Sequence, residues 1–202
     1  IAADTKAQDL FDNCFDITDG PTAPDVDVIE LDKEIILLLT NDESSNNFKE
    51  LYEERIIGVP DVTTDTNYIF EGYRIYQVSG PGVTKSQLTD LNRAREIRTL
   101  DLKNGVKKIY NWTSVKNPDQ TQPKVWSPHL QVAGLDLGIK HTLRITKDVF
   151  STVGSSALVN HKDYYFFVVA YGYNNFANFD VSNSAGTQAT SYINGRLNVG
   201  VG

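Results

Sequence analysis

The sequence predicts an all-β protein that folds as a single β-sandwich. The strongest observation is the run Asp163–Tyr173, which holds more β-forming residues in unbroken succession than any other stretch. Alternate residues of a strand point to opposite faces, and this run places apolar side chains on both, so we expect it to be the central strand. Leu158 precedes Tyr164 by six positions. That spacing is typical of a sandwich corner in which the tyrosine hydroxyl bonds to upstream backbone.

Length and composition favour one soluble domain with a long insertion. The 202 residues are 40% hydrophobic and 22% charged, as in ordinary globular proteins, and are enough to bury a core without disulfides or metals. The formal net charge of -7 argues against nucleic-acid binding, which requires a basic face. No apolar run approaches the length of a membrane span. We therefore expect neither nucleic acid nor a bilayer as a partner.

The first 20 residues differ in pattern from the rest. Residues 2–15 carry apolar side chains at the spacing of one helical face, which predicts a short amphipathic helix, and turn residues at 18–24 then form a linker. Cys14, the single cysteine, is expected to be buried as a small hydrophobe rather than to be a reactive thiol. Because the chain contains no methionine, even at its first position, we expect a mature or excised segment of a longer protein.

A β-hairpin is expected after the linker. Alternating apolar residues predict strands at 26–31 and 35–39, with Asp32 and Lys33 in the turn between them. Residues 41–54 are polar and acidic, with a helical turn expected near Phe48. The next strand covers 68–78 and is ended by the Gly-Pro-Gly sequence that follows it.

The segment 86–155 is too long to be a hairpin connection and must contain structure of its own. We expect it to pack on the same core as the rest of the sandwich. Asn104-Gly105 separates two β-rich runs, which predicts a hairpin between them. The elements expected from here to the end of the sandwich are a short helix or turn at 86–92, strands at 94–101 and 106–112, strand-like pieces at 125–126 and 140–146, a turn or short helix at 147–150, and a last strand at 187–193.

Several of these stretches together resemble the fibronectin type III fold. They are Ala23-Pro-Asp-Val-Asp-Val28, Glu34-Ile-Ile-Leu-Leu-Leu39, Glu71-Gly-Tyr-Arg-Ile-Tyr76, and Leu158 with the run 164–170. The resemblance implies a fibronectin type III/immunoglobulin-like β-sandwich over residues 21–194, with a long insertion at about 86–155 and the short N-terminal helix ahead of it. Leu39 stands where fibronectin type III domains usually place a core tryptophan.

A narrower likeness concerns large secreted proteins of Bacteroidota, which are typically exported by the type IX system. Its carriers are Ala7–Asp12, Phe70–Gln77, Lys103–Val106 and Gly195-Arg196. This resemblance implies a secreted or cell-surface module with a non-catalytic structural or assembly role. Its partners would be neighbouring domains or subunits of the same protein. It implies no catalytic residues, and an enzyme ranks last among the functions considered.

The residue types that usually carry chemistry form no recognised motif. His129, His141 and His161 lack metal-ligand spacing and are expected at the surface. Acidic residues pair in loops, as Asp16 with Asp19, Asp25 with Asp27, and Asp61 with Asp65. Such oxygens could hold Ca²⁺ loosely, but Ca²⁺ wants six or more of them, so solvated acidic loops are the favoured interpretation. We expect no cofactor, with loosely bound Ca²⁺ as the alternative.

The alternative function is a carbohydrate-binding module appended to a larger secreted protein. Tyr110, Trp112 and Trp126 lie in the expected insertion, where an exposed aromatic platform could stack on the sugar rings of a polysaccharide. A second small core built from the same side chains is favoured, because large aromatic residues usually supply burial.

The last stretch, residues 195–202, has a strand pattern. Leu197, Val199 and Val201 alternate with polar residues or glycine. No partner strand is evident within the predicted sandwich. We therefore expect this stretch, like the N-terminal helix, to attach to a following domain or a neighbouring subunit, since an unpaired strand can complete another chain's sheet.

Overall fold

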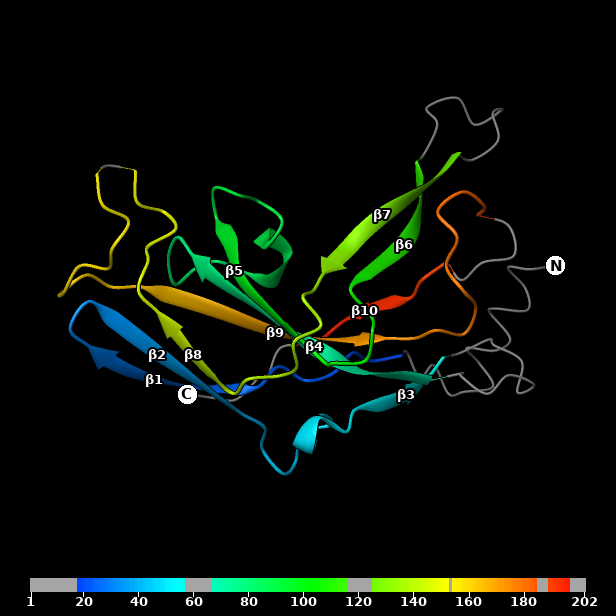
Figure 1. Ribbon diagram of the computed structural model, residues 1–202, viewed down its shortest axis with the longest axis horizontal. Coiled ribbons are helices and arrows are strands. Elements are labelled where there is room, and N and C mark those ends of the chain that lie inside the picture. The colour runs from blue at the N-terminus through cyan, green and yellow to red at the C-terminus, as the bar shows by residue number, and fades with distance from the viewer. Residues whose placement is uncertain (1–17, 57–66, 116–124, 153, 185–188, 197–202) are drawn as a thin grey trace.

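The computed structural model describes residues 18–56, 67–115, 125–152, 154–184 and 189–196 (Figure 1). Within these ranges the regular elements are β-strands and two short 3₁₀ turns, η1 (Phe48–Glu50) and η2 (Lys85–Gln87). The prediction of an all-β chain is confirmed. The helix predicted at 2–15, with Cys14, lies outside the described residues. No helix among the described residues is long and apolar enough to cross a membrane.

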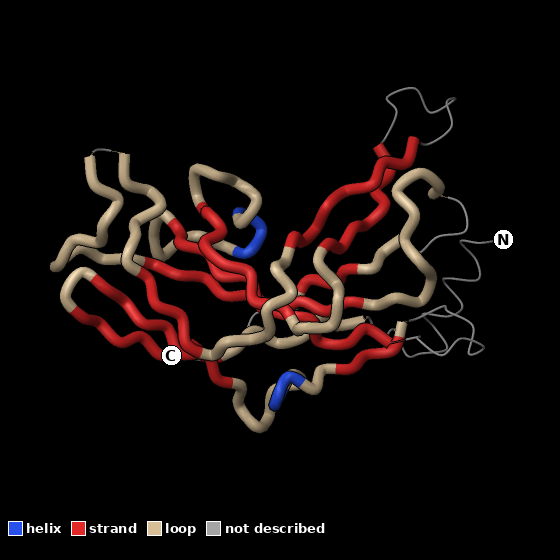
Figure 2. The backbone as a smooth tube through the Cα atoms, viewed as in Figure 1, coloured by secondary structure: helices blue, strands red, loops and turns tan. Residues whose placement is uncertain are grey.

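The strands of the described residues form three antiparallel sheets, and Figure 2 draws these strands in red. The first contains β1 (Asp25–Leu31), β2 (Glu34–Thr40) and β8 (Thr142–Ile145), in that order. The second has the order β10 (Tyr192–Asn194), β9 (Tyr165–Tyr173), β4 (Asn67–Val78) and β3 (Glu53–Arg55), and β5 (Ala94–Asp101) also pairs with β4. The third is the hairpin of β6 (Lys108–Val115) and β7 (Val125–Ala133).

The hairpin predicted at the start of the chain is confirmed. β1 pairs with β2 in a register that places Leu31 opposite Glu34. Lys33 has φ 54 in the tight turn between them. On β2 the side chains of Leu37 and Leu39 are buried, whereas Ile36 and Leu38 on the other face are half-buried. This alternation is what a sheet with one face on a core requires.

The first and second sheets share one apolar core. Leu37 and Leu39 from β2 and Ile145 from β8 belong to the same buried cluster as Ile75 from β4 and Val168 from β9. The side chains of Leu37 and Ile75 are fully buried. The strands of two different sheets therefore meet through their inner faces, and their core is the largest of the buried apolar clusters among the described residues.

β9 has apolar neighbours on both faces, as the sequence predicts. Val168 and Ala170 face the shared core. Val169 packs in a second cluster with Tyr76 and Ala94, and Tyr171 packs in a third with Ile109 of β6 and Val132 of β7. The outer face of the second sheet is therefore covered by the chain itself, partly by the segment between β4 and β5 and partly by the β6–β7 hairpin.

The predicted corner is also confirmed. The backbone N–H of Val159 donates a hydrogen bond to the hydroxyl of Tyr164 at 2.8 Å, and the adjacent Leu158 is buried. Lys162, within the same corner, donates to the carboxylate of Asp148 at 2.6 Å. That carboxylate also accepts a 2.7 Å hydrogen bond from the Gln77 side chain on β4. The corner is thus tied to the second sheet by polar as well as apolar contacts.

The hairpin predicted around Asn104-Gly105 is wrong. β5 pairs with β4, and β6 pairs with β7, so the two strands on either side of the turn belong to different sheets. The prediction failed because the turn is held by side chains that lie more than 30 residues away in the sequence. Asp136 accepts hydrogen bonds from the backbone N–H groups of Asn104 at 2.8 Å and Gly105 at 2.9 Å, and the Asn104 side chain donates to Glu71 at 2.8 Å.

The middle of the chain contributes to both principal sheets. β5 and β8 lie within the expected insertion at 86–155, yet they pair with β4 and β2. The β6–β7 hairpin is the part of that segment that forms a sheet of its own. β3 was not expected from the sequence. β3 pairs with the start of β4 over only three residues, which is too short for an alternating apolar pattern to appear in the sequence.

The first two residues of the expected C-terminal strand differ from the prediction. Gly195 donates its N–H to the Ala170 carbonyl at 2.9 Å, and Arg196 donates its N–H to the Pro21 carbonyl at 3.0 Å. The N–H of Ala23 donates in turn to the Arg196 carbonyl at 2.9 Å. These two residues therefore have partners inside the module. Residues 197–202 lie outside the described part of the chain.

Candidate functional site

A buried acidic side chain lies at the junction of the second sheet with two loops. Glu71 is the residue at which the register between β4 and β9 shifts, and it is fully buried. One of its carboxylate oxygens accepts the 2.8 Å hydrogen bond from the Asn104 side chain, and the other, Oε1, has no partner among the described residues. A buried oxygen without a partner is costly, more so when it is charged.

Burial raises the pKa of Glu71 to about 8, against the opposing effect of the Asn104 hydrogen bond. The negative charges of Asp101 and Asp136 act in the same direction as burial. Asp101 is itself buried and accepts a 2.7 Å hydrogen bond from the backbone N–H of Asp136. Asp101 and Asp136 hold the loops after β5 and β7 against the sheet, and a pKa of about 8 favours the protonated form of Glu71 at neutral pH.

The acidic side chains do not gather into a metal site in the described part of the chain. No group of three or more His, Cys, Asp and Glu side chains there has the arrangement to hold an ion. Asp19 pairs with Arg196 at 2.9 Å. Asp25 and Asp27 lie on β1 rather than in the loop expected for them, while Asp16, Asp61 and Asp65 fall outside the described residues.

The histidines are exposed, as expected, and lie apart. His129 lies on β7, and His161 lies in the corner with φ 62. His141 makes a 2.7 Å contact from its Nε2 to the carboxylate of Glu50 in η1.

The three aromatic residues singled out from the sequence lie on one face of the β6–β7 hairpin. Tyr110 and Trp112 are two residues apart on β6, and the register places Trp126 opposite Ser114, two residues further on. Directly opposite residues of an antiparallel pair share a face. The structure thus brings Tyr110, Trp112 and Trp126 to the same side of one hairpin.

Phe179, from the loop after β9, packs on two of the three aromatic side chains. Its ring stacks on Tyr110 with centroids 5.4 Å apart and on Trp112 with centroids 5.6 Å apart. Trp112 is only 7% exposed, whereas Trp126 is 45% exposed. The Trp112 indole therefore belongs to a small core on this face of the hairpin, and the Trp126 indole is accessible to a partner. Sequence reasoning missed Phe179 because it lies in a loop without a periodic apolar pattern, far in sequence from β6.

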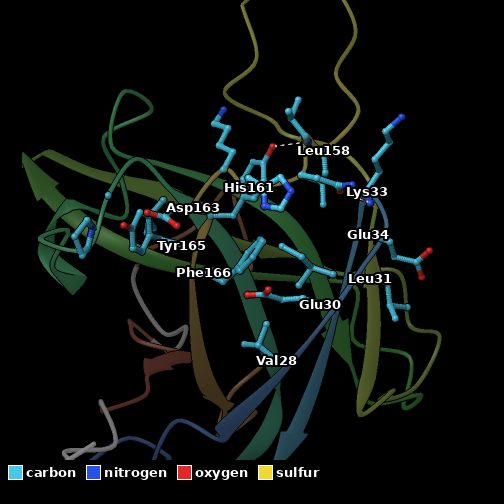
Figure 3. Close-up of a pocket in the computed structure, with 18 of the residues that line it drawn as sticks. Val28, Glu30, Leu31, Lys33, Glu34, Leu158, His161, Asp163, Tyr165 and Phe166 are labelled. Carbon is cyan, nitrogen blue, oxygen red and sulfur yellow. Dashed lines mark hydrogen bonds between the residues drawn. The ribbon is translucent and has the colours of Figure 1, made fainter.

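A groove runs between β1 and the start of β9. It measures about 1270 Å³ and is lined by β1, by the corner and by residues 164–167. Figure 3 shows Val28 and Glu30 of β1 and Phe166 of β9 lying between the two strands. Val28 is 53% exposed, so this wall of the groove presents an apolar side chain that the described residues leave in contact with solvent. The sequence predicted neither the groove nor its residues, because it is formed by strands far apart in the chain.

Comparisons with models of known protein families, with curated proteins and with solved structures found no match.

Replacing Glu71 with glutamine should flatten the pH dependence of stability. The raised pKa means that the folded state holds a proton that the unfolded state releases above its ordinary pKa of 4.5. Stability is therefore lost as pH rises from 4.5 towards the folded value of about 8. The slope from this one group is at most ~1.4 kcal/mol per pH unit.

The measurement is urea unfolding at a series of pH values across that window, with Glu71→Gln beside an exposed control, Glu43→Gln. We expect Glu71→Gln to lose the slope and to be more stable than the native chain at pH 8 and above. The control should keep the native slope. A Glu71→Gln variant with an unchanged slope would show that another group causes the pH dependence.

The two tryptophans should differ in their access to solvent. The Trp126→Phe variant, which retains only the buried Trp112, should emit at short wavelength and resist quenching by iodide. The Trp112→Phe variant, which retains Trp126, should be quenched several-fold more strongly. Equal quenching of the two single-tryptophan variants would contradict the stacking of Phe179 on Trp112.

Proposed function

We propose that the chain is a fibronectin type III-like module with a non-catalytic structural or assembly role in a secreted or cell-surface bacterial protein. The order of the strands supports the fold part of the proposal. In sandwiches of this class the first, second and fifth strands share one sheet, and the third, sixth and seventh share the other. β1, β2 and β8 correspond to the former set, and β4, β9 and β10 to the latter.

Two further features agree with this assignment. β5 pairs with β4 on the side away from β9, which is the place of the additional strand in larger sandwiches of the class. The Tyr164 hydroxyl accepts a hydrogen bond from the backbone N–H of Val159, which supports a correspondence with the tyrosine corner of this class and of β9 with the strand that follows it. On this assignment β3 and the β6–β7 hairpin are elaborations.

The proposed structural or assembly role is supported by a difference between the outer face of the first sheet and the outer face of the second sheet. The outer face of the second sheet is covered by the chain, as described above. The outer face of the first sheet presents Ile29 at 43% exposure and Leu31 at 51%, beside the half-buried Ile36 and Leu38. Glu34 and Arg144 form an ion pair next to them, so an apolar centre has a charged neighbour.

Such a surface fits a contact with a neighbouring domain or subunit. Buried apolar centres with polar rims are the usual anatomy of protein interfaces. A structural module in a larger secreted protein needs a surface of this kind, whereas an enzyme needs convergent reactive groups in a cleft. Export to the cell surface rests on the sequence resemblance alone.

A carbohydrate-binding module remains the second candidate, and the exposure of Trp126 is the observation that favours it. Leu130, opposite Tyr110 on the same hairpin face, is also exposed, at 44%. A sugar ring could stack on the Trp126 indole there. Loss of polysaccharide retardation in affinity electrophoresis on Trp126→Ala, with retention in Trp112→Phe, would favour this candidate over the structural role.

The structural proposal predicts a cross-link from the outer face of the first sheet. A photo-reactive amino acid placed at Ile29 in the intact parent protein, on its own cells, should cross-link to another segment or subunit of that same protein, identified by mass spectrometry. The matched control is Leu91, which is more exposed, at 71%, but lies in the segment between β4 and β5. Position 91 should give no such product, and equal yields at both positions would contradict a specific docking face.

A further inference from the structure

One edge of β9 is open over part of its length in the described part of the chain. β4 pairs with the opposite edge from end to end. On the edge in question, β10 pairs with Tyr171–Tyr173, and Gly195 donates its N–H to the Ala170 carbonyl. No strand among the described residues pairs with 165–169 on this side. An open edge of this kind is a template for an added strand.

The open edge presents backbone groups of two residues that face the shared core. The Ala170 carbonyl points to this edge, because it accepts the Gly195 N–H. Alternate residues of a strand direct their N–H and C=O groups to the same edge, so those of Val168 and Phe166 point there as well. At ~3.3 Å per residue, the stretch 165–169 spans about 16 Å. It therefore has room for an added strand of about five residues.

This edge borders the groove between β9 and β1. Residues 164–167 line the groove together with Val26 and Val28 of β1. Tyr164, Phe166 and Val26 also pack against the shared core. An extended segment bound here would have backbone groups to pair with on β9 and apolar side chains to contact on its core-facing side. Strand addition to a sheet edge uses these two kinds of contact, the first for affinity and the second for specificity.

The charged side chains that line the groove have an acidic excess. Two of them are already neutralised, because Glu34 is paired with Arg144 and Lys162 with Asp148. The remaining charged residues among the described lining residues are three acids and one base: Glu30, Asp32, Asp163 and Lys33. Complementary charge between two surfaces favours the matching partner and disfavours others. The groove therefore favours a segment that carries a lysine or an arginine.

Glu30 is the acidic side chain placed to pair with such a residue. Figure 3 shows it between Val28 of the same strand and Phe166 of β9. The ion pairs among the described residues do not include Glu30. A basic side chain of a bound segment would pair with this carboxylate while the neighbouring side chains of the segment contact Val28 and Phe166.

A second copy of the chain does not supply this chemistry through its own β1. That strand has acidic residues at positions 25, 27 and 30 and no lysine or arginine. Its insertion into the groove of another copy would place these acids beside Glu30 and Asp163, and such a like-charge contact is costly. The charge of the groove thus favours a different polypeptide segment over β1 of a second copy.

We propose that the groove binds an extended segment of a partner polypeptide, which adds to β9 as a strand along residues 165–169. The segment has apolar side chains at alternate positions, which face the core, and a lysine or arginine that pairs with Glu30. The groove is a different surface from the outer face of the first sheet. The inference therefore goes beyond the docking face proposed above, and either one can fail without the other.

A pair of synthetic peptides tests the site on the intact chain. The probe is acetyl-Lys-Val-Thr-Val-Thr-Val-Lys-amide, whose lysine at each end can meet Glu30 in either strand direction, and the control peptide has glutamate in place of both lysines. In an NMR titration we expect the largest amide shifts at residues 165–169. The lysine peptide should bind roughly threefold to fivefold more tightly, as an exposed ion pair gives. No binding of the lysine peptide, shifts confined to other strands, or equal affinity of the two peptides would overturn the proposal.

A charge reversal tests the role of Glu30. Glu30→Lys should invert the preference, so that the glutamate peptide binds more tightly than the lysine peptide. The matched control is Glu43→Lys, an exposed acidic residue in the loop after β2 and outside the groove, which should keep the native preference. Both positions are exposed, so both variants should fold. The same preference in the two variants would show that Glu30 does not select the segment.

A photo-reactive amino acid at Val28 in the intact parent protein, on its own cells, tests for the natural occupant. Mass spectrometry should identify a cross-linked segment with alternating apolar residues and at least one lysine or arginine, from another domain, subunit or protein. A cross-link to another part of this module, to a second copy of it, or to a segment without a basic residue would overturn the proposal. The absence of any cross-link would do so as well.

Discussion

The pairing of β4 with β9 is the constraint on which the rest of the structure depends. It runs from Ile69 and Tyr173 at one end to Val78 and Tyr165 at the other. Both strands have buried side chains on their two faces, and each of the three apolar clusters contains residues of one or both. If these strands separated, the shared core and both coverings of the second sheet would lose one of their walls.

This arrangement explains which faces of the sheets are covered by other parts of the chain. One face of the β4–β9 pair receives β2 and β8, and the opposite face receives the segment before β5 and the β6–β7 hairpin. In the described part of the chain, the outer face of the first sheet is one of the surfaces that remain open. The outer face of the first sheet is apolar in part, and we have proposed a neighbouring domain or subunit as its partner.

Local sequence patterns predicted the parts of the fold that depend on neighbouring residues. The β1–β2 hairpin, β9 and the Tyr164 corner all follow from alternation or spacing within a dozen residues. The Asn104-Gly105 hairpin was wrong because Asp136 and Glu71, both more than 30 residues away, hold that turn. Local patterns could also not predict the groove or the stacking of Phe179 on Trp112. Each is formed by segments that are far apart in the sequence and that only the fold brings together. An acidic residue inside the apolar run at 68–78 was the one signal that could have indicated Glu71.

Native-state hydrogen exchange measured by NMR on the intact chain tests the central claim most directly. If the β4–β9 pairing holds the structure together, the amides of Ile75 and Val168 should exchange only through global unfolding, with the same free energy as urea unfolding gives. Amides of the β6–β7 hairpin should exchange with a lower free energy, because the hairpin contributes no residue to the core that the first and second sheets share. Slowest exchange in β6–β7, or clearly different free energies for β4 and β9, would contradict this account.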